Sequence, residues 1–122
     1  MNNYKPFIIF FDSINNPIST PIVGEGLDTS SLSDMSIEIK NATKINMIVE
    51  GCGCIFDGNN NKLADTDCVW TPLAVVNATT FNVSQSITNN GIYLINLGGC
   101  RKIRVNVTEV TGKATVTGMG VR

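Results

Sequence analysis

The chain has 122 residues, of which 43% are hydrophobic and 16% are charged. This length suits a single domain, and the composition is that of a folded protein rather than a disordered one. Nine basic and ten acidic side chains give a net charge of −1, so there is no basic excess for binding nucleic acid or an anionic membrane surface. Histidine is absent. The commonest general base and the commonest zinc ligand are therefore missing, which argues against an enzyme.

The first predicted strand is an apolar run near the N-terminus, and it does not alternate with polar residues. Its members are Phe7, Ile8, Ile9, Phe10 and Phe11. A strand that is apolar on both faces must bury both. Either the irregular segment 12–34 of the same chain covers the second face, or another subunit does. We take these five residues as the candidate partner contact, with possible self-association.

The same run is too short for the apolar core of a secretory signal peptide, because Asp12 follows it directly. No segment approaches the length of a membrane span. We therefore expect a protein without a signal peptide that stays in the cytoplasm where it is made and has no membrane partner.

Strand patterns fill the rest of the chain. Residues 35–40 and 103–108 alternate strictly between apolar and polar side chains, which is typical of strands with one buried face. Further segments rich in β-branched or aromatic residues are 45–49, 69–76, 81–87, 92–97 and 114–121. Asn90-Gly91 and Thr111-Gly112 are expected as hairpin turns. No segment has a helical period.

These patterns predict an all-β fold, an antiparallel β-sandwich of about eight short strands, immunoglobulin-like or jelly-roll-like. We expect one domain over residues 1–122. Within it, residues 1–43 would form the N-terminal strand and an irregular arm, and residues 44–122 the sandwich core.

Four cysteines, Cys52, Cys54, Cys68 and Cys100, are the strongest candidates for a metal or a cross-link. Tetrahedral zinc would need two closely spaced ligand pairs, but Cys68 and Cys100 are far apart in the sequence. Disulfides are the second alternative, and reduced, buried thiols are the third. A cytoplasmic protein favours the third, so we predict no structural metal and no cofactor.

Three other patterns have simpler explanations. The loop that begins at Asp57 has several oxygen donors but lacks the glycine and glutamate positions of a calcium loop. Asp65 and Asp67 could act as a carboxylate pair, yet their place in a loop suggests solvated turn residues. Trp70, Tyr4 and Tyr93 could form a sugar-stacking surface, but so few aromatic side chains are more often used for packing.

Six segments, in order, resemble the β-sandwich modules of tailed-bacteriophage virion proteins. They are Met47-Ile48-Val49-Glu50-Gly51, Asp57-Gly58-Asn59, Val69-Trp70-Thr71-Pro72-Leu73, Asn90-Gly91-Ile92-Tyr93, Arg101-Lys102-Ile103-Arg104-Val105 and Gly112-Lys113-Ala114-Thr115-Val116-Thr117. The resemblance covers about two thirds of the chain. It departs at Cys52-Gly53-Cys54, at the loop 59–62 and over the first 43 residues.

The resemblance implies that Trp70, Tyr93, Ile103 and Val105 are core packing residues and that no catalytic site exists. It also implies a non-enzymatic structural protein of a phage or phage-like particle, located in the virion after assembly in the host cytoplasm, with virion proteins as partners. Among such roles we favour a capsid decoration protein. A tail or baseplate component is the alternative, and a carbohydrate-binding module for host recognition is the alternative from another class.

Overall fold

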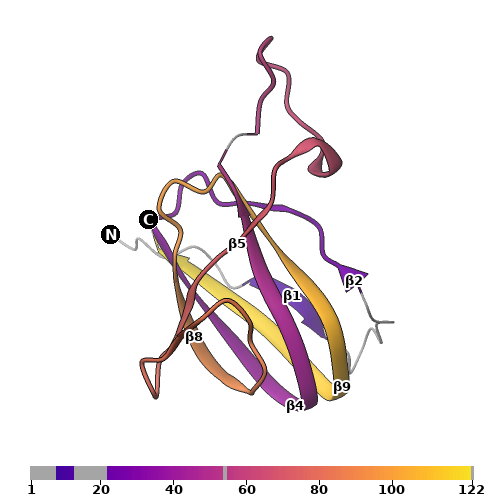
Figure 1. Cartoon of the computed structure of the whole chain (residues 1–122), viewed down its shortest axis with the longest axis vertical. Coiled ribbons are helices and arrows are strands. Elements are labelled where there is room, and N and C mark those ends of the chain that lie inside the picture. Colours follow the sequence, from indigo (N-terminus) through magenta and orange to yellow (C-terminus); the bar gives the residue numbers. More distant parts are fainter. Residues whose placement is uncertain (1–7, 13–21, 54, 122) are drawn as a thin grey trace.

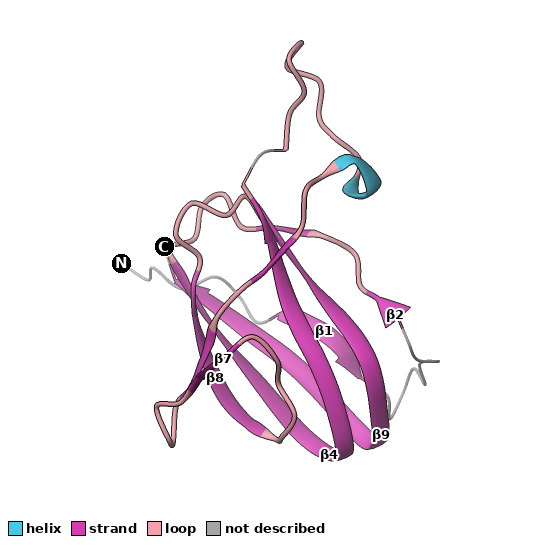
Figure 2. Ribbon diagram, in the orientation of Figure 1, coloured by secondary structure: helices cyan, strands magenta, loops and turns pink. Residues whose placement is uncertain are grey.

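The computed structural model describes residues 8–12, 22–53 and 55–121. Within them lie nine strands and one short 3-10 helix, η1 (Asp65–Asp67). The strands are β1 (Ile8–Asp12), β2 (Ile22–Val23), β3 (Leu27–Asp28), β4 (Asp34–Cys52), β5 (Thr71–Pro72), β6 (Val75–Asn77), β7 (Val83–Ser84), β8 (Gly91–Asn96) and β9 (Lys102–Val121). Every strand pairing is antiparallel. The all-β prediction is confirmed (Figure 2).

Two long strands form the frame of the fold. β4 has 19 residues and β9 has 20, and they pair with each other along nearly their whole lengths. The sequence predicts separate strands at 35–40 and 45–49, and again at 103–108 and 114–121. In the structure each pair is one strand that continues through a sharp bend, as Figure 1 shows at its lower end.

Turn residues inside the two long strands produce this bend. Asn41 has φ +62° and Gly112 has φ +89°, and the pairing register shifts on both sides of Ala42, which lies opposite Gly112. The Asn90 side chain holds the bend from the side. Its Oδ1 accepts the Ala42 N–H at 3.0 Å, and its Nδ2 donates to the Ala42 carbonyl at 2.9 Å. Thr111-Gly112 is therefore a bend within β9 and not the predicted hairpin turn.

The bend folds the sheet over itself into two layers that share β4 and β9. In the first layer the order is β1, the C-terminal half of β9, the N-terminal half of β4, β8, β6 and β7. In the second layer, β2 and β3 pair with the N-terminal half of β9, and β5 pairs with the C-terminal end of β4. Position 43, the predicted end of the irregular arm, thus falls inside β4.

The main core lies between these layers. Alternate residues of both halves of β4 point into it and are almost fully buried: Met35, Ile37, Ile39, Ile45, Met47 and Val49. Ile103 and Val105 from β9 and Tyr93 from β8 lie in the same cluster. Burial of large aliphatic side chains from both layers, each contributing roughly 1.5–3 kcal/mol, is what holds the folded-over sheet together.

Two predicted strands are much shorter than expected. Within residues 69–76, only β5 and the first two residues of β6 are strand, and Val69 is 80% exposed. Of residues 81–87, only Val83–Ser84 form a strand, and Ile87 adds a single bridge to Met47. Here the side-chain oxygens of Asn77, Thr80 and Ser84 accept hydrogen bonds from nearby backbone N–H groups. These bonds form turns in place of strand pairing.

Candidate binding surface

An apolar row crosses the outer face of the first layer. Ser36 of β4 pairs with Leu94 of β8 on one side and with Met119 of β9 on the other, and Leu94 pairs with Val76 of β6. One step along the strands, Glu38 pairs with Ile92 and with Thr117. Because residues paired across strands share a face, these side chains all point away from the core. Leu94, Ile92 and Met119 are between 42% and 45% exposed.

This surface, which we call the outer face, is hollowed. A shallow depression of about 430 Å³ is lined by Asp34, Met35, Ser36, Val76, Leu94, Ile95, Asn96 and Met119. A second one, of about 250 Å³, shares Ser36 and Met119 with the first and continues over Glu38, Ile92, Thr117 and Gly118. The two therefore form one continuous concave apolar area that crosses β8, β4 and β9. Exposed apolar patches of this kind mark contact sites.

Two carboxylates of the outer face come from its central strand, β4. Asp34 lines the larger depression and Glu38 the smaller one. Glu38 also forms an ion pair of 3.3 Å with Lys40, but both side chains are well exposed. An exposed pair of this kind contributes little to stability. Because the pair is weak, a basic side chain of a partner can replace Lys40 beside Glu38.

The sequence contains a signal for the outer face in β8. Residues 92–97 read Ile-Tyr-Leu-Ile-Asn-Leu and fail to alternate, as the N-terminal run fails. In the structure, Tyr93, Ile95 and Leu97 face the core, which leaves Ile92 and Leu94 outside. A strand that is apolar on both faces indicates a second buried surface, in β8 as in residues 7–11.

The N-terminal candidate contact is an edge strand. β1 pairs with the C-terminal half of β9, with a bulge between Ile9 and Phe11. Phe10 is partly buried and packs against the main core beside Gly118. Part of the run therefore serves the fold of its own chain. Phe7 lies outside the described residues.

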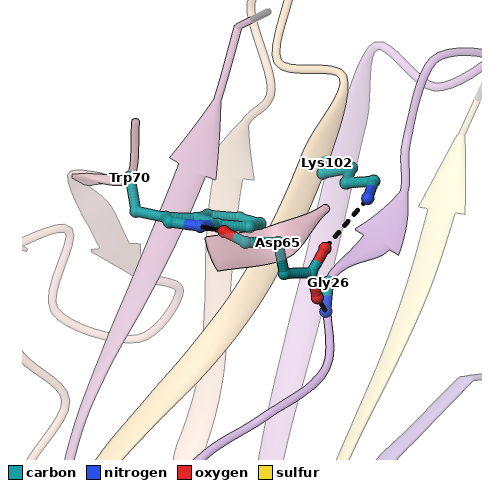
Figure 3. Close-up of polar contacts among 4 residues, drawn as sticks. All are labelled: Gly26, Asp65, Trp70 and Lys102. Atoms are coloured by element: carbon teal, nitrogen blue, oxygen red, sulfur yellow. Dashed lines mark hydrogen bonds and ion pairs between the residues drawn. The ribbon is translucent and has the colours of Figure 1, made fainter. Parts of the chain in front are cut away.

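A separate polar cluster fastens the long loop 53–70 to the sheet (Figure 3). The Asp65 carboxylate accepts the Gly26 N–H at 2.8 Å and binds the Lys102 ammonium at 2.9 Å. The hydrogen bond from Lys102, followed by that from Gly26, holds the pKa of Asp65 below its ordinary value. The same bond raises the pKa of Lys102. The side chain of Lys102 is only 10% exposed, so Asp65 is its essential counter-charge.

Trp70 belongs to this fastening and not to the main core. Its Nε1 donates to the Asp65 carbonyl at 2.8 Å, and the Arg104 guanidinium lies 4.3 Å from its ring centroid. Arg104 in turn donates to Glu50 at 2.8 Å. Our expectation of a core anchor therefore needs correction, because the ring is half-buried under the loop and stacked below a cation.

The remaining sequence candidates fall into structural roles. Cys52 and Cys68 are buried with Ile55 in a second small cluster, and Leu63 and Trp70 pack against it. Cys54 lies outside the described residues. Among the residues that the structure describes, no three of the types Cys, Asp and Glu are grouped to hold a metal ion.

The loop that resembles a calcium site is an Asx-type turn. Asp57 accepts the Asn59 N–H at 2.8 Å and the Asn61 N–H at 3.0 Å, and these bonds lower the pKa of Asp57. Asn60 at the tip has φ +62°. The acidic and amide residues thus satisfy the backbone of the loop.

The proposed sugar-stacking surface is not assembled from Trp70 and Tyr93. Tyr93 is 5% exposed and donates its hydroxyl to the Asn89 carbonyl, whereas Trp70 lies under Arg104. Tyr4 lies outside the described residues. In the described part of the chain, no helix has the length and apolar character needed to span a membrane.

Known proteins resemble this chain in fold rather than in sequence. The sequence matches no protein-family model and none of the curated proteins. The structure gives a different result. The fold is shared with two prophage-derived proteins.

The first is the SPBc2 prophage-derived protein YomS, with a TM-score of 0.71 and 21% identity over 100% of this chain and 97% of that one. The second is the PBSX exported protein XepA, with a TM-score of 0.69 and 15% identity. Here the match covers 100% of this chain but 39% of XepA, so this fold makes up about two fifths of that protein. At these identities the likeness concerns the fold. It shows that this fold occurs in prophage-derived proteins, and the expected membership of a virion-protein family stays a prediction.

Proposed function

We propose that this chain is a non-enzymatic structural protein of a bacteriophage or phage-like particle that attaches to a particle protein through the outer face. The observation that carries the proposal is the concave apolar area over β8, β4 and β9, with Leu94, Ile92 and Met119 exposed at its centre. The shared fold with YomS and XepA supports the link to phages.

The outer face selects a partner by its chemistry. Its exposed apolar side chains lie beside the carboxylates of Asp34 and Glu38, and Glu38 is held by a weak ion pair with Lys40. A complementary surface would be a convex apolar patch with lysine or arginine side chains around it. The partner that we propose is therefore a protein surface.

For its place in the particle we propose capsid decoration. A small module fits a protein that is added to a preformed lattice. When the outer face contacts the lattice, the protruding loop 55–64 and the second layer lie away from that contact (Figure 1). The description of XepA as exported favours one second candidate, a phage protein that leaves the cell without being part of the particle.

The experiment is to purify particles by density gradient and to count copies of this chain per major structural protein by mass spectrometry. Heads and tails are then separated and counted again. The proposal expects a fixed copy number that follows the heads. A fixed number that follows the tails would overturn the decoration role and keep the structural one. If the chain were found only in particle-free medium, the exported candidate would replace both.

A further inference from the structure

Two cysteines stand at the two ends of the loop that projects from the sheet. Cys52 is the last residue of β4, and Cys68 directly follows η1. Between them, residues 55–67 project beyond the sheet, as Figure 1 shows at its upper end. Inward-facing Ile55 and Leu63 hold the base of the loop together, and the Leu63 N–H donates to the Ile55 carbonyl at 2.7 Å.

The two side chains meet in the second cluster. Cys52 is 1% exposed and Cys68 is 8% exposed. Both side chains pack with Ile55 in that small cluster, and burial, together with the neighbouring Cys52 side chain, raises the pKa of Cys68. In the structure Cys52, Cys68 and Cys100 are all thiols. Because the cluster has only three buried members, small side-chain movements can bring these two sulfur atoms to the separation of a disulfide.

We propose that Cys52 and Cys68 form a disulfide under oxidising conditions, and that this bond closes the base of the loop. The inference does not depend on the proposed function. Among the other cysteines that the structure describes, Cys100 packs beside Gly51, the residue before Cys52, and is not a member of the small cluster. Shared packing in this cluster therefore favours Cys68 as the partner of Cys52.

The chemistry is thiol–disulfide exchange with a small disulfide such as oxidised glutathione. One cysteine loses its proton, attacks a glutathione sulfur and releases the first glutathione thiolate, which gives a mixed disulfide. The second cysteine then loses its proton and attacks the protein sulfur of that mixed disulfide, so the S–S bond forms and the second glutathione thiolate leaves. The protein gives up two electrons and two protons, and one glutathione disulfide becomes two thiols.

Two properties of the pair define how the reaction should behave. Because the attacking species is a thiolate and the pKa of Cys68 is raised, formation should accelerate as the pH rises through and above the ordinary thiol range. Because the bond would close a loop of only about 17 residues, it should raise Tm by roughly 10 °C by restricting the unfolded chain.

The test uses the full chain in two matched double variants. Cys54→Ser with Cys100→Ser keeps the proposed pair, and Cys52→Ser with Cys68→Ser keeps the other two cysteines. Circular dichroism first establishes that each reduced variant is folded. Each is then equilibrated in glutathione buffers of increasing oxidised fraction, and its thiols are counted by the mass added on maleimide labelling after unfolding.

The proposal expects the first variant to lose both thiols and to gain the rise in Tm, and the second to keep both thiols. If the first variant keeps both thiols in fully oxidised glutathione, the proposal is wrong. Peptide mapping of the oxidised wild-type chain decides the matter even if a variant fails to fold. A linkage of Cys52 to Cys68 supports the inference, and a linkage of either one to Cys54 or Cys100 overturns it.

Discussion

Substitution of Gly112 by alanine tests whether the bend in the two long strands determines the fold. Gly112 has φ +89°, a backbone conformation that costs a residue with a side chain about 1–2 kcal/mol. A Cβ added there would lie 2.6 Å from Thr43 Oγ1, 2.7 Å from the Thr43 nitrogen and 3.0 Å from the Asn41 carbonyl oxygen. Two of these atoms belong to the backbone of the facing strand, so relief requires β4 to move.

The expected loss follows from these two terms. Overpacking of a fixed site costs about 1–3 kcal/mol, and together with the backbone term we expect a decrease of about 3 kcal/mol in the free energy of unfolding. With an unfolding entropy of about 2.1 cal/mol/K per residue, this loss corresponds to a Tm about 12 °C lower for a chain of 122 residues.

Two further glycines separate the terms. Gly99 has φ +92° but nothing within 4 Å of an added Cβ, so Gly99→Ala should lose about 1 kcal/mol from the backbone term alone. Gly58 is exposed, has no positive φ and has the same open space, so Gly58→Ala should stay within about 0.5 kcal/mol of wild type. Guanidinium unfolding followed by far-UV circular dichroism measures all three. If Gly112→Ala were as stable as Gly58→Ala, the bend would not be the constraint that we describe.

Two more substitutions test polar contacts. Asp65→Asn should lower the free energy of unfolding by about 2 kcal/mol, because the buried Lys102 ammonium loses its counter-charge. The pKa of Asp65 is lowered in the folded state. The stabilisation that ionised Asp65 gives the fold is therefore complete above the ordinary pKa near 3.8 and is lost as the pH falls through the lowered pKa. Measurement of Tm against pH in acid should show this loss in wild type and not in the variant. Asn90→Ala should cost about 1 kcal/mol, or about 4 °C in Tm, because both of its bonds to the bend at Ala42 are removed.

Matched controls accompany these variants. Glu109→Gln removes an ion pair with Lys44 in which both side chains are at least 45% exposed, so it should change the free energy of unfolding by less than about 0.5 kcal/mol. Asn89→Ala removes the neighbouring amide, whose side chain makes a 3.4 Å contact with Thr88, and should have a similarly small effect. A loss in either control equal to that of its partner variant would show that the assigned contact is not the cause.

The strands could be predicted from the sequence because burial of one face leaves a period of two. Residues 35–40 and 103–108 alternate and do form strands. Their continuation through the bend could not be predicted in the same way. Asn41 and Gly112 have the chemistry of turn residues, and the sequence does not distinguish a bend within a strand from a turn between two strands.

The outer face and the fastening of the loop differ in how far the sequence indicates them. The outer face was predictable, because Ile92 and Leu94 interrupt an alternating pattern. The fastening of the loop was not, because Asp65 and Lys102 are 37 residues apart and a single polar pair leaves no periodic signal. Trp70 was assigned to the core from a resemblance, whereas the loop that carries it forms its own small cluster.

The most direct test of the account is the incorporation of a variant of the outer face into particles. Leu94→Glu places a carboxylate in the centre of the apolar row, and Val69→Glu, at an 80% exposed loop position that lines neither depression, is the control. Both are checked for wild-type stability and then supplied in equal amounts with wild-type chain during assembly. The account predicts that the copy number of Leu94→Glu in purified particles falls at least about tenfold while Val69→Glu matches wild type. Equal incorporation of a folded Leu94→Glu would contradict it.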